Sequence, residues 1–209
     1  MAKAGIMGGT FNPIHLGHVS LARMAYEQFG LDKVIFIPSG DPPHKKDQHI
    51  ADSKDRLKMV ELAIKDYDYF ETSSIEINRK GYSYTSDTLK ELHNMFPADE
   101  FYYITGADSL FNIESWHEPD KIFKQCILLT AYRDNIPYDV FYDKIDKLML
   151  KYDADIRVIQ TSVIDISSTK IRKALSDNCL DDTDNVNMQY IDKNVIRYVI
   201  EHNLYKCED

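Results

Sequence analysis

Short apolar segments alternate along this chain with longer segments in which apolar residues recur every three or four positions. The short segments are nearly continuous apolar runs, which is typical of strands buried on both faces of a parallel sheet. We therefore expect strands at Lys3–Met7, Lys33–Ile37, Phe70–Ile77, Phe101–Thr105, Ile127–Ala131 and Ile156–Gln160.

Between these runs the apolar residues follow a helical spacing. The clearest sets are Leu57, Val60 and Ile64; Leu89, Leu92 and Phe96; Phe141, Ile145, Leu148 and Tyr152; and Ile191, Val195 and Val199 with Ile196 and Ile200 beside them. Strands and helices that alternate at these lengths predict an α/β fold, a doubly wound parallel sheet with helices on both faces. No repeat or linker divides the chain, so residues 1–209 are interpreted as one domain, with an exposed loop over residues 176–187.

A glycine- and histidine-rich segment follows the first expected strand. It reads GGTFNPIHLGH over residues 8–18, and a helix is expected over Val19–Phe29. Two glycines let the backbone approach a ligand closely, although a tight turn alone would also explain them. His15 and His18 lie three apart at a helix start and can share one face. Ligands of such sheets bind beyond the carboxyl ends of the strands, where this segment falls. A zinc pair from the two histidines would need a further ligand.

A second polar segment, ISSTKIR, occupies residues 166–172 after the last expected strand. Ser and Thr at a helix start satisfy free N–H groups, and the same helix end also attracts anions. Arg172 lies about one turn into this helix, within reach of an anion bound there. The G-x-G-x-x-G fingerprint and the Walker pattern are both absent, and the second strand leads to Pro38 instead of an acid, which disfavours a dehydrogenase.

The segments GGTF-x-P-x-H-x-G-H and I-S-S-T-x-I-R resemble the two signatures of the nucleotidylyltransferase superfamily, and specifically those of bacterial nicotinate-nucleotide adenylyltransferases. The resemblance spans residues 3–205, and Asn12 departs from it where the family usually has Asp. It implies one Rossmann-like nucleotidylyltransferase domain. It also implies transfer of the adenylyl group of ATP to nicotinate mononucleotide in NAD biosynthesis, with release of pyrophosphate. We expect Mg²⁺ to enter with ATP, because no carboxylate cluster predicts a metal site.

The same resemblance implies roles for individual residues. Catalytic roles fall to His15, His18, Lys45 and Arg172. ATP binding falls to Gly8, Gly9, Thr10, Phe11, His15, His18, Gly106, Asp108, Ser167, Ser168, Thr169 and Arg172. Nicotinate mononucleotide binding falls to Gly9, Thr10, His44, Lys45, Thr85, Trp116, His117 and Arg133. Within this set, Trp116 would stack on the pyridine ring, and His117 stands where many members have Tyr.

Composition limits the other function classes. The formal net charge is -9 and no long Lys/Arg run occurs, so non-specific nucleic-acid binding is not expected. No apolar run has the length to span a bilayer and no signal peptide is evident, which indicates a cytoplasmic protein. The three scattered cysteines, Cys126, Cys179 and Cys207, suit reduced thiols. The sequence does not decide whether the chain forms a homo-oligomer. It also leaves two other functions open: a sister adenylyltransferase acting on NMN or another phosphate acceptor, and a non-catalytic nucleotide sensor.

Overall fold

The structure is a computed structural model that describes residues 1–42, 50–132, 136–161, 166–176 and 188–205. Its centre is a six-stranded sheet in the order β3-β2-β1-β4-β5-β6. Every neighbouring pair of strands is parallel. The strands are β1 (Lys3–Gly9), β2 (Lys33–Pro38), β3 (Phe70–Thr72), β4 (Glu100–Gly106), β5 (Ile127–Ala131) and β6 (Ile156–Ile159). Because the order runs outward from β1 in both directions, the expected doubly wound α/β fold is confirmed.

Helices fill the connections between the strands within the described ranges. They are α1 (Leu16–Phe29), α2 (Ser53–Ile64), α3 (Ile75–Asn78), α4 (Thr85–Met95), α5 (Ala107–Asn112), α6 (Pro119–Gln125), α7 (Tyr138–Tyr152), α8 (Ser168–Ser176) and α9 (Lys193–Glu201). The short 3-10 helices η1 (Ile113–Ser115) and η3 (Met188–Tyr190) lie after α5 and before α9. Among the residues described, no helix is both long and apolar enough to cross a membrane.

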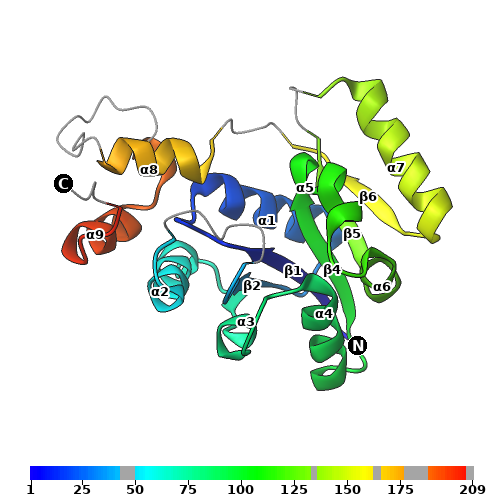
Figure 1. Ribbon diagram of the computed structural model, residues 1–209, viewed down its shortest axis with the longest axis horizontal. Helices are drawn as coiled ribbons and strands as arrows, with labels where there is room; N and C mark the ends of the chain where they lie inside the picture. The colour runs from blue at the N-terminus through cyan, green and yellow to red at the C-terminus, as the bar shows by residue number, and fades with distance from the viewer. Residues whose placement is uncertain (43–49, 133–135, 162–165, 177–187, 206–209) are drawn as a thin grey trace.

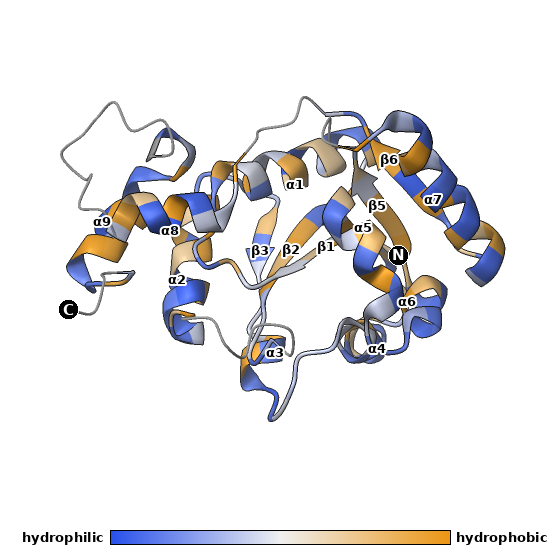
Figure 2. Ribbon diagram, turned by 45° about the horizontal axis from the view of Figure 1, so that its top comes forward, coloured by the Kyte–Doolittle hydropathy of each residue, from blue (hydrophilic) through white to orange (hydrophobic). Residues whose placement is uncertain are grey.

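Each face of the sheet has its own apolar core. Val34 and Phe36 of β2 point to a core shared with α1, α2, α8 and α9. Ile35 and Ile37 point the other way, to a core shared with α4, α5, α6 and α7. Figure 1 shows α1 and α4 on opposite sides of the strands, with α9 and α7 at the two ends of the molecule. In Figure 2 the strands are largely orange, whereas α7 carries separate blue and orange stripes. This is the pattern that two-sided burial of the sheet requires.

The third strand is the clearest error of the sequence interpretation. A strand was expected over Phe70–Ile77, but β3 ends at Thr72 after three pairs with β2, and α3 follows at Ile75. Two serines account for the change of direction. The Ser73 hydroxyl accepts a hydrogen bond from the N–H of Ile75 at 3.3 Å, and the Ser74 carbonyl accepts one from the N–H of Asn78 at 2.9 Å. The Ser73 bond is a local side-chain contact that competes with strand pairing, and the Ser74 bond is the first main-chain bond of α3.

The other boundaries differ by a few residues. β5 has the expected bounds, while β1, β2 and β4 run on to Gly9, Pro38 and Gly106. β6 ends at Ile159, one residue early, and α1 begins at Leu16 instead of Val19. The carboxyl ends of the strands lie at one edge of the sheet, and the two signature segments begin there.

Two leucines on α7 provide a test of the core. Leu148 is 1% exposed and Leu150 is 90% exposed. We expect Leu148→Ala to lower the free energy of unfolding by about 2–5 kcal/mol, because it leaves a cavity in the core. Leu150→Ala, with the same chemistry on the same helix, should change it by less than about 0.5 kcal/mol. Urea denaturation followed by circular dichroism measures both, and equal effects would contradict the described packing of α7.

Candidate active site

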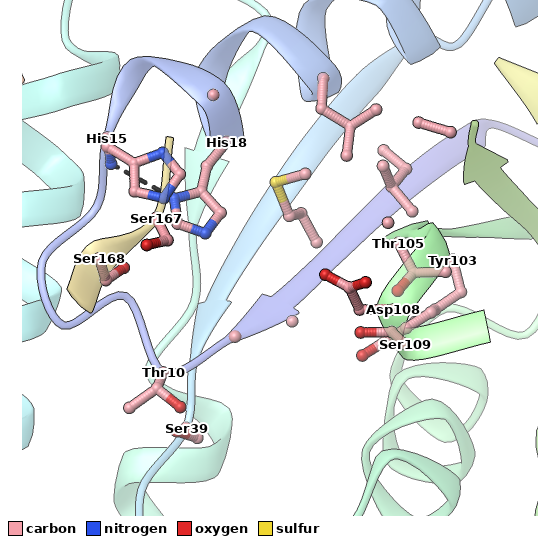
Figure 3. Close-up of a pocket in the computed structure, with 18 of the residues that line it drawn as sticks. Thr10, His15, His18, Ser39, Tyr103, Thr105, Asp108, Ser109, Ser167 and Ser168 are labelled. Carbon is pink, nitrogen blue, oxygen red and sulfur yellow. Dashed lines mark hydrogen bonds between the residues drawn. The ribbon is translucent and has the colours of Figure 1, made fainter. Parts of the chain in front are cut away.

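A cavity of about 580 Å³ opens at the carboxyl ends of the strands. It is lined by residues from both signature segments and from the connections after β2, β4 and β5. In Figure 3, His15, His18, Ser167 and Ser168 lie on one side of this cavity. Tyr103, Thr105, Asp108 and Ser109 lie on the other side, and Thr10 and Ser39 lie at the bottom of the view, below the histidines and serines. The position agrees with the general rule for ligand binding in open parallel sheets.

Glycines on both sides of the turn between β1 and α1 lie close to neighbouring side chains. A Cβ atom added to Gly8 would lie 2.8 Å from the Tyr103 hydroxyl oxygen, so only glycine fits beside that ring. A Cβ on Gly17 would lie 3.0 Å from Ile166 Cγ2 and 3.0 Å from the His15 ring. Gly17 therefore lets the start of the second segment approach the first turn of α1. The glycines thus permit two close contacts, of Gly8 with Tyr103 and of Gly17 with Ile166, which a tight turn alone would not require.

His15 and His18 share one face, as their spacing predicted. His15 is the N-cap of α1, and the two imidazole rings stack with centroids 3.7 Å apart. The main-chain N–H of His15 donates to Nδ1 of His18 at 3.3 Å, drawn as a dashed line in Figure 3. Because Nδ1 accepts, a neutral His18 ring carries its proton on Nε2. The ring thus has a donor on the side opposite the α1 backbone.

The second segment lies directly against the first. The Ser168 hydroxyl donates to the carbonyl of Pro13 at 2.9 Å, and Arg172 Nη1 donates to the carbonyl of Asn12 at 2.9 Å. The Ser167 carbonyl accepts the N–H of Ile171 at 3.1 Å, so Ser167 precedes α8 as an N-cap residue. Residues 10–18 and 166–172 therefore form one continuous wall of the cavity.

This wall is suited to anions although the whole chain is acidic. The N-terminal ends of α1 and α8 both reach the cavity, through Gly17, His18, Ser168 and Thr169. Free N–H groups at a helix start and the helix dipole both favour negative charge. Arg172 adds a fixed cation at the same place. A phosphate chain is the ligand class that such a wall accommodates best.

Aromatic side chains form the opposite wall. Trp116 is half-buried and packs edge-on against Tyr103, with ring centroids 6.1 Å apart. The hydroxyls of Tyr103 and Thr85 lie 3.5 Å apart, and Thr85 is the first residue of α4. Tyr84, the N-cap of α4, lies 4.3 Å from the His117 ring. Since Trp116 is only half-buried, this wall offers a flat apolar surface to a ring.

A charged cluster fixes the segment that carries Trp116. Glu114 in η1 accepts hydrogen bonds from Lys144 at 2.5 Å and from Lys151 at 2.7 Å, both on α7. These two ammonium groups lower the pKa of Glu114 to about 2. The carboxylate is thus charged at neutral pH and joins the turn before Trp116 to the outer helix.

Most of the expected site residues line this one cavity. They are Gly8, Gly9, Thr10, His15, His18, Thr85, Gly106, Asp108, Trp116, His117, Ser167, Ser168, Thr169 and Arg172. Phe11 is placed differently. Its ring is 2% exposed and packs edge-on against His18 and near Phe36, so its side chain belongs to the core beneath the site. His44, Lys45 and Arg133 lie outside the described residues.

The sequence interpretation missed Arg56 and Glu76. Arg56 is 1% exposed and donates hydrogen bonds to four main-chain carbonyls, including that of Thr10 at 2.7 Å. Glu76 is also buried and lines the cavity; burial raises its pKa, and Thr88 donates to it at 2.7 Å. A signal for Arg56 existed, because it lies four residues before Val60 and eight before Ile64, on the buried stripe of α2. No comparable pattern marks Glu76.

Asn12 connects the first segment to the end of the chain. Its Oδ1 accepts the hydroxyl of Tyr205 at 2.8 Å and the N–H of Ala51 at 3.1 Å. Asn12 is 4% exposed, so both partners come from inside the protein. The amide oxygen fills a role in positioning the backbone, and no charge is needed for these two hydrogen bonds.

In the described part of the chain, no group of three or more His, Cys, Asp or Glu side chains is arranged to hold a metal ion. The wall formed by residues 10–18 and 166–172 presents N–H groups, hydroxyls, imidazoles and one guanidinium to the cavity.

Comparisons with known proteins agree with this architecture. A family model described as cytidylyltransferase-like matches residues 6–174. A protein of Lachnoclostridium phytofermentans named "Probable nicotinate-nucleotide adenylyltransferase" is 39% identical over 98% of this chain and 100% of its own length. A protein of Clostridium botulinum with the same name is 38% identical over 100% of both chains. The structure of Plasmodium falciparum nicotinic acid mononucleotide adenylyltransferase complexed with NaAD matches with a TM-score of 0.78, at 21% identity and 98% coverage of both chains.

The fold and the two-segment phosphate wall, together with the match over residues 6–174, place the chain in the cytidylyltransferase-like family of nucleotidyltransferases. The two relatives described above, which match over their full length, carry the name of one enzyme within this family. Within that family the chain belongs with the nicotinate-nucleotide adenylyltransferases.

The hydrogen bond from Tyr205 to Asn12 can be tested by removing one oxygen. We expect Tyr205→Phe to lower the free energy of unfolding by about 0.5–1.5 kcal/mol, because Asn12 Oδ1 loses a buried donor. Tyr67→Phe is the matched control, since the Tyr67 hydroxyl makes no hydrogen bond within the described residues. Urea titrations compare the two variants, and a Tyr205→Phe effect no larger than the control would show that the hydrogen bond contributes nothing.

Proposed function

We propose that this chain transfers the adenylyl group of ATP to nicotinate mononucleotide, giving nicotinate adenine dinucleotide and pyrophosphate in NAD biosynthesis. The observation that carries the proposal is the single cavity in which residues 10–18 and 166–172 face an aromatic wall with Thr85 and Trp116. One wall suits a polyphosphate and the other suits a pyridine ring. The names of the full-length relatives support the same activity.

The reaction requires alignment and charge stabilisation, with no protein nucleophile. A phosphate oxygen of the acceptor attacks the α-phosphorus of ATP and forms the new P–O bond. The bond from that phosphorus to the bridging oxygen breaks, and pyrophosphate leaves with the electron pair. Orientation of the two reactants can supply on the order of 7–11 kcal/mol of the barrier. A helix end contributes only about 0.3–1 kcal/mol, rising to about 2 in partly buried sites.

His18 is assigned to the α-phosphate. Its Nδ1 is held by the His15 N–H, so Nε2 carries the donor that faces away from the α1 backbone. A donor fixed in advance stabilises the charge on the non-bridging oxygens without reorganising. We assign the N-terminal end of α8 and Arg172 to the β- and γ-phosphates, because they converge on the same wall.

The aromatic wall is assigned to the acceptor. Trp116 offers a half-buried ring face for the pyridine, and Thr85 and its neighbours offer polar groups for the nicotinate carboxylate. The Plasmodium falciparum neighbours are complexes with NaAD and with APC, which supports nucleotide binding by this fold. Binding roles for His44, Lys45 and Arg133 stay predictions, since these residues lie outside the described ranges. The side chain of Phe11 is not part of this assignment.

Mg²⁺ belongs to the substrate in this proposal. It enters with ATP, whose phosphate oxygens are ligands of the kind that Mg²⁺ prefers. A cytoplasmic location stays a prediction from the sequence, and so does any homo-oligomeric state.

The choice of acceptor is tested by a substrate panel. With Mg·ATP fixed, pyrophosphate release is measured with nicotinate mononucleotide, NMN and pantetheine phosphate in parallel. We expect kcat/KM to be highest for nicotinate mononucleotide. A higher value for another acceptor would indicate a sister transferase, and no pyrophosphate with any acceptor would indicate a nucleotide sensor.

The role of His18 is tested by substitution. We expect His18→Ala to reduce kcat by about 10²–10³-fold, the usual effect of removing one fixed donor to a transition-state oxygen. Unfolding midpoints should change little, because the ring lies at the cavity wall. His202→Ala is the control, as His202 is exposed at the end of α9. Near-normal kcat in folded His18→Ala would refute the assignment.

A further inference from the structure

Arg56 is a buried cation whose hydrogen-bond partners are all neutral. Nε donates to the carbonyl of Ala51 at 3.0 Å, and Nη1 donates to that of Thr10 at 2.7 Å. Nη2 donates to the carbonyls of Ser39 at 2.6 Å and Gly40 at 3.3 Å. Among the residues that the structure describes, no carboxylate forms an ion pair with it; Asp52 and Glu76 act on its charge only from a distance.

The four carbonyls belong to three separate segments of the chain. Thr10 lies in the phosphate-binding turn between β1 and α1, and Ser39–Gly40 follows β2. Ala51 precedes α2, the helix that carries Arg56 itself. Thr10 and Ser39 line the cavity, whereas Arg56 does not. The guanidinium therefore joins parts of the cavity wall from behind, without contact with the cavity.

The Ser39–Gly40 segment continues to the aromatic wall. The N–H of Gly40 donates to the Ser83 hydroxyl at 3.0 Å, and Ser83 lines the cavity two residues before Thr85. A Cβ atom on Gly40 would lie 2.3 Å from the carbonyl oxygen of Glu76, so the segment is also pressed against α3. Arg56 thus links the phosphate wall at Thr10 to the acceptor wall through Ser39 and Gly40.

The chemistry of the side chain explains why a charge is buried here. Burial lowers the pKa of Arg56, and this is opposed by Tyr205, Asp52 and Glu76. A guanidinium nevertheless stays protonated in proteins, and its planar fork presents five N–H donors in fixed directions. Lysine offers one point charge on a flexible stem, and an apolar side chain would leave buried carbonyls without donors.

We propose that Arg56 is a positioning residue that fixes the phosphate-binding turn at Thr10 relative to Ser39–Gly40, and thereby aligns ATP with the acceptor. The inference depends on the proposed function, because alignment has meaning only if two substrates react across this cavity. Each substrate would still bind its own wall without Arg56. The cost would appear in the transition state, where a displacement of about 1 Å lowers the rate by about 10²-fold.

The test compares Arg56→Lys and Arg56→Met with the wild type. In both variants we expect kcat to fall by about 10²-fold. KM for ATP and for nicotinate mononucleotide should change by less than about threefold, the pattern of an interaction that counts only in the transition state. Lys58→Met is the matched control, because Lys58 is a cation on the same helix with an exposed side chain paired to Glu61. It should keep wild-type kcat.

A second measurement separates positioning from simple structural support. The folded fraction of each variant is measured by circular dichroism, and kcat is expressed per folded molecule. In Arg56→Ala, added guanidinium ion well below denaturing concentration should raise kcat along a saturable curve, and it should not raise that of the wild type. A folded Arg56→Lys with wild-type kcat, or a folded Arg56→Ala that guanidinium does not rescue, would overturn the proposal.

The same assay keeps the two proposals distinct. Wild-type pyrophosphate release with nicotinate mononucleotide tests the proposed function, whereas the ratio of variant to wild-type kcat tests Arg56. If the wild type is active and the folded variants keep its kcat, the positioning role of Arg56 is rejected and the proposed function stands. If the wild type releases no pyrophosphate with any acceptor, both proposals are rejected.

Discussion

Two main-chain carbonyls, those of Asn12 and Pro13, hold the candidate active site together. Ser168 and Arg172 of α8 donate hydrogen bonds to them, and through these contacts the last third of the chain becomes part of the first βα turn. The phosphate wall depends on this junction, because neither segment alone surrounds an anion. The sheet brings the two segments to the same edge, but these hydrogen bonds determine how they face each other.

One wall of the candidate site gathers groups that favour an anion, in a protein whose formal net charge is -9. It uses few cations for this purpose. Two helix N-terminal ends and Arg172 face the cavity, and Arg56 lies behind it. Backbone N–H groups keep their orientation without the conformational freedom of long side chains, which is an advantage where a transition state needs fixed donors. The acidic remainder of the surface does not cancel such a local field.

The sequence predicted the parts of this structure that depend on local patterns. Apolar runs indicated the strands and their burial on both faces, and the two signature segments indicated the phosphate wall. The spacing of His15 and His18 predicted their shared face. The bend that ends β3 was missed, because the local hydrogen bond of the Ser73 hydroxyl and the first helical bond of α3 outweigh the alternation of apolar and polar residues there. Arg56 was missed because a charged residue is rarely buried without an ion pair, and its partners come from three separate segments of the chain. Phe11 was expected at the ligand, but its ring fills the core below His18.

The junction between the chain's two ends also bears on how the protein is made. Its hydrogen bonds connect residues 155, 160 and 193 positions apart. Contacts of such separation form late, since loop-closure entropy must first be overcome. During synthesis, β1 and the histidine pair leave the ribosome long before α8 and Tyr205 do. A nascent chain can therefore build much of its sheet while this wall is still incomplete, and competence for nucleotide arises only after α8 and Tyr205 have been synthesised.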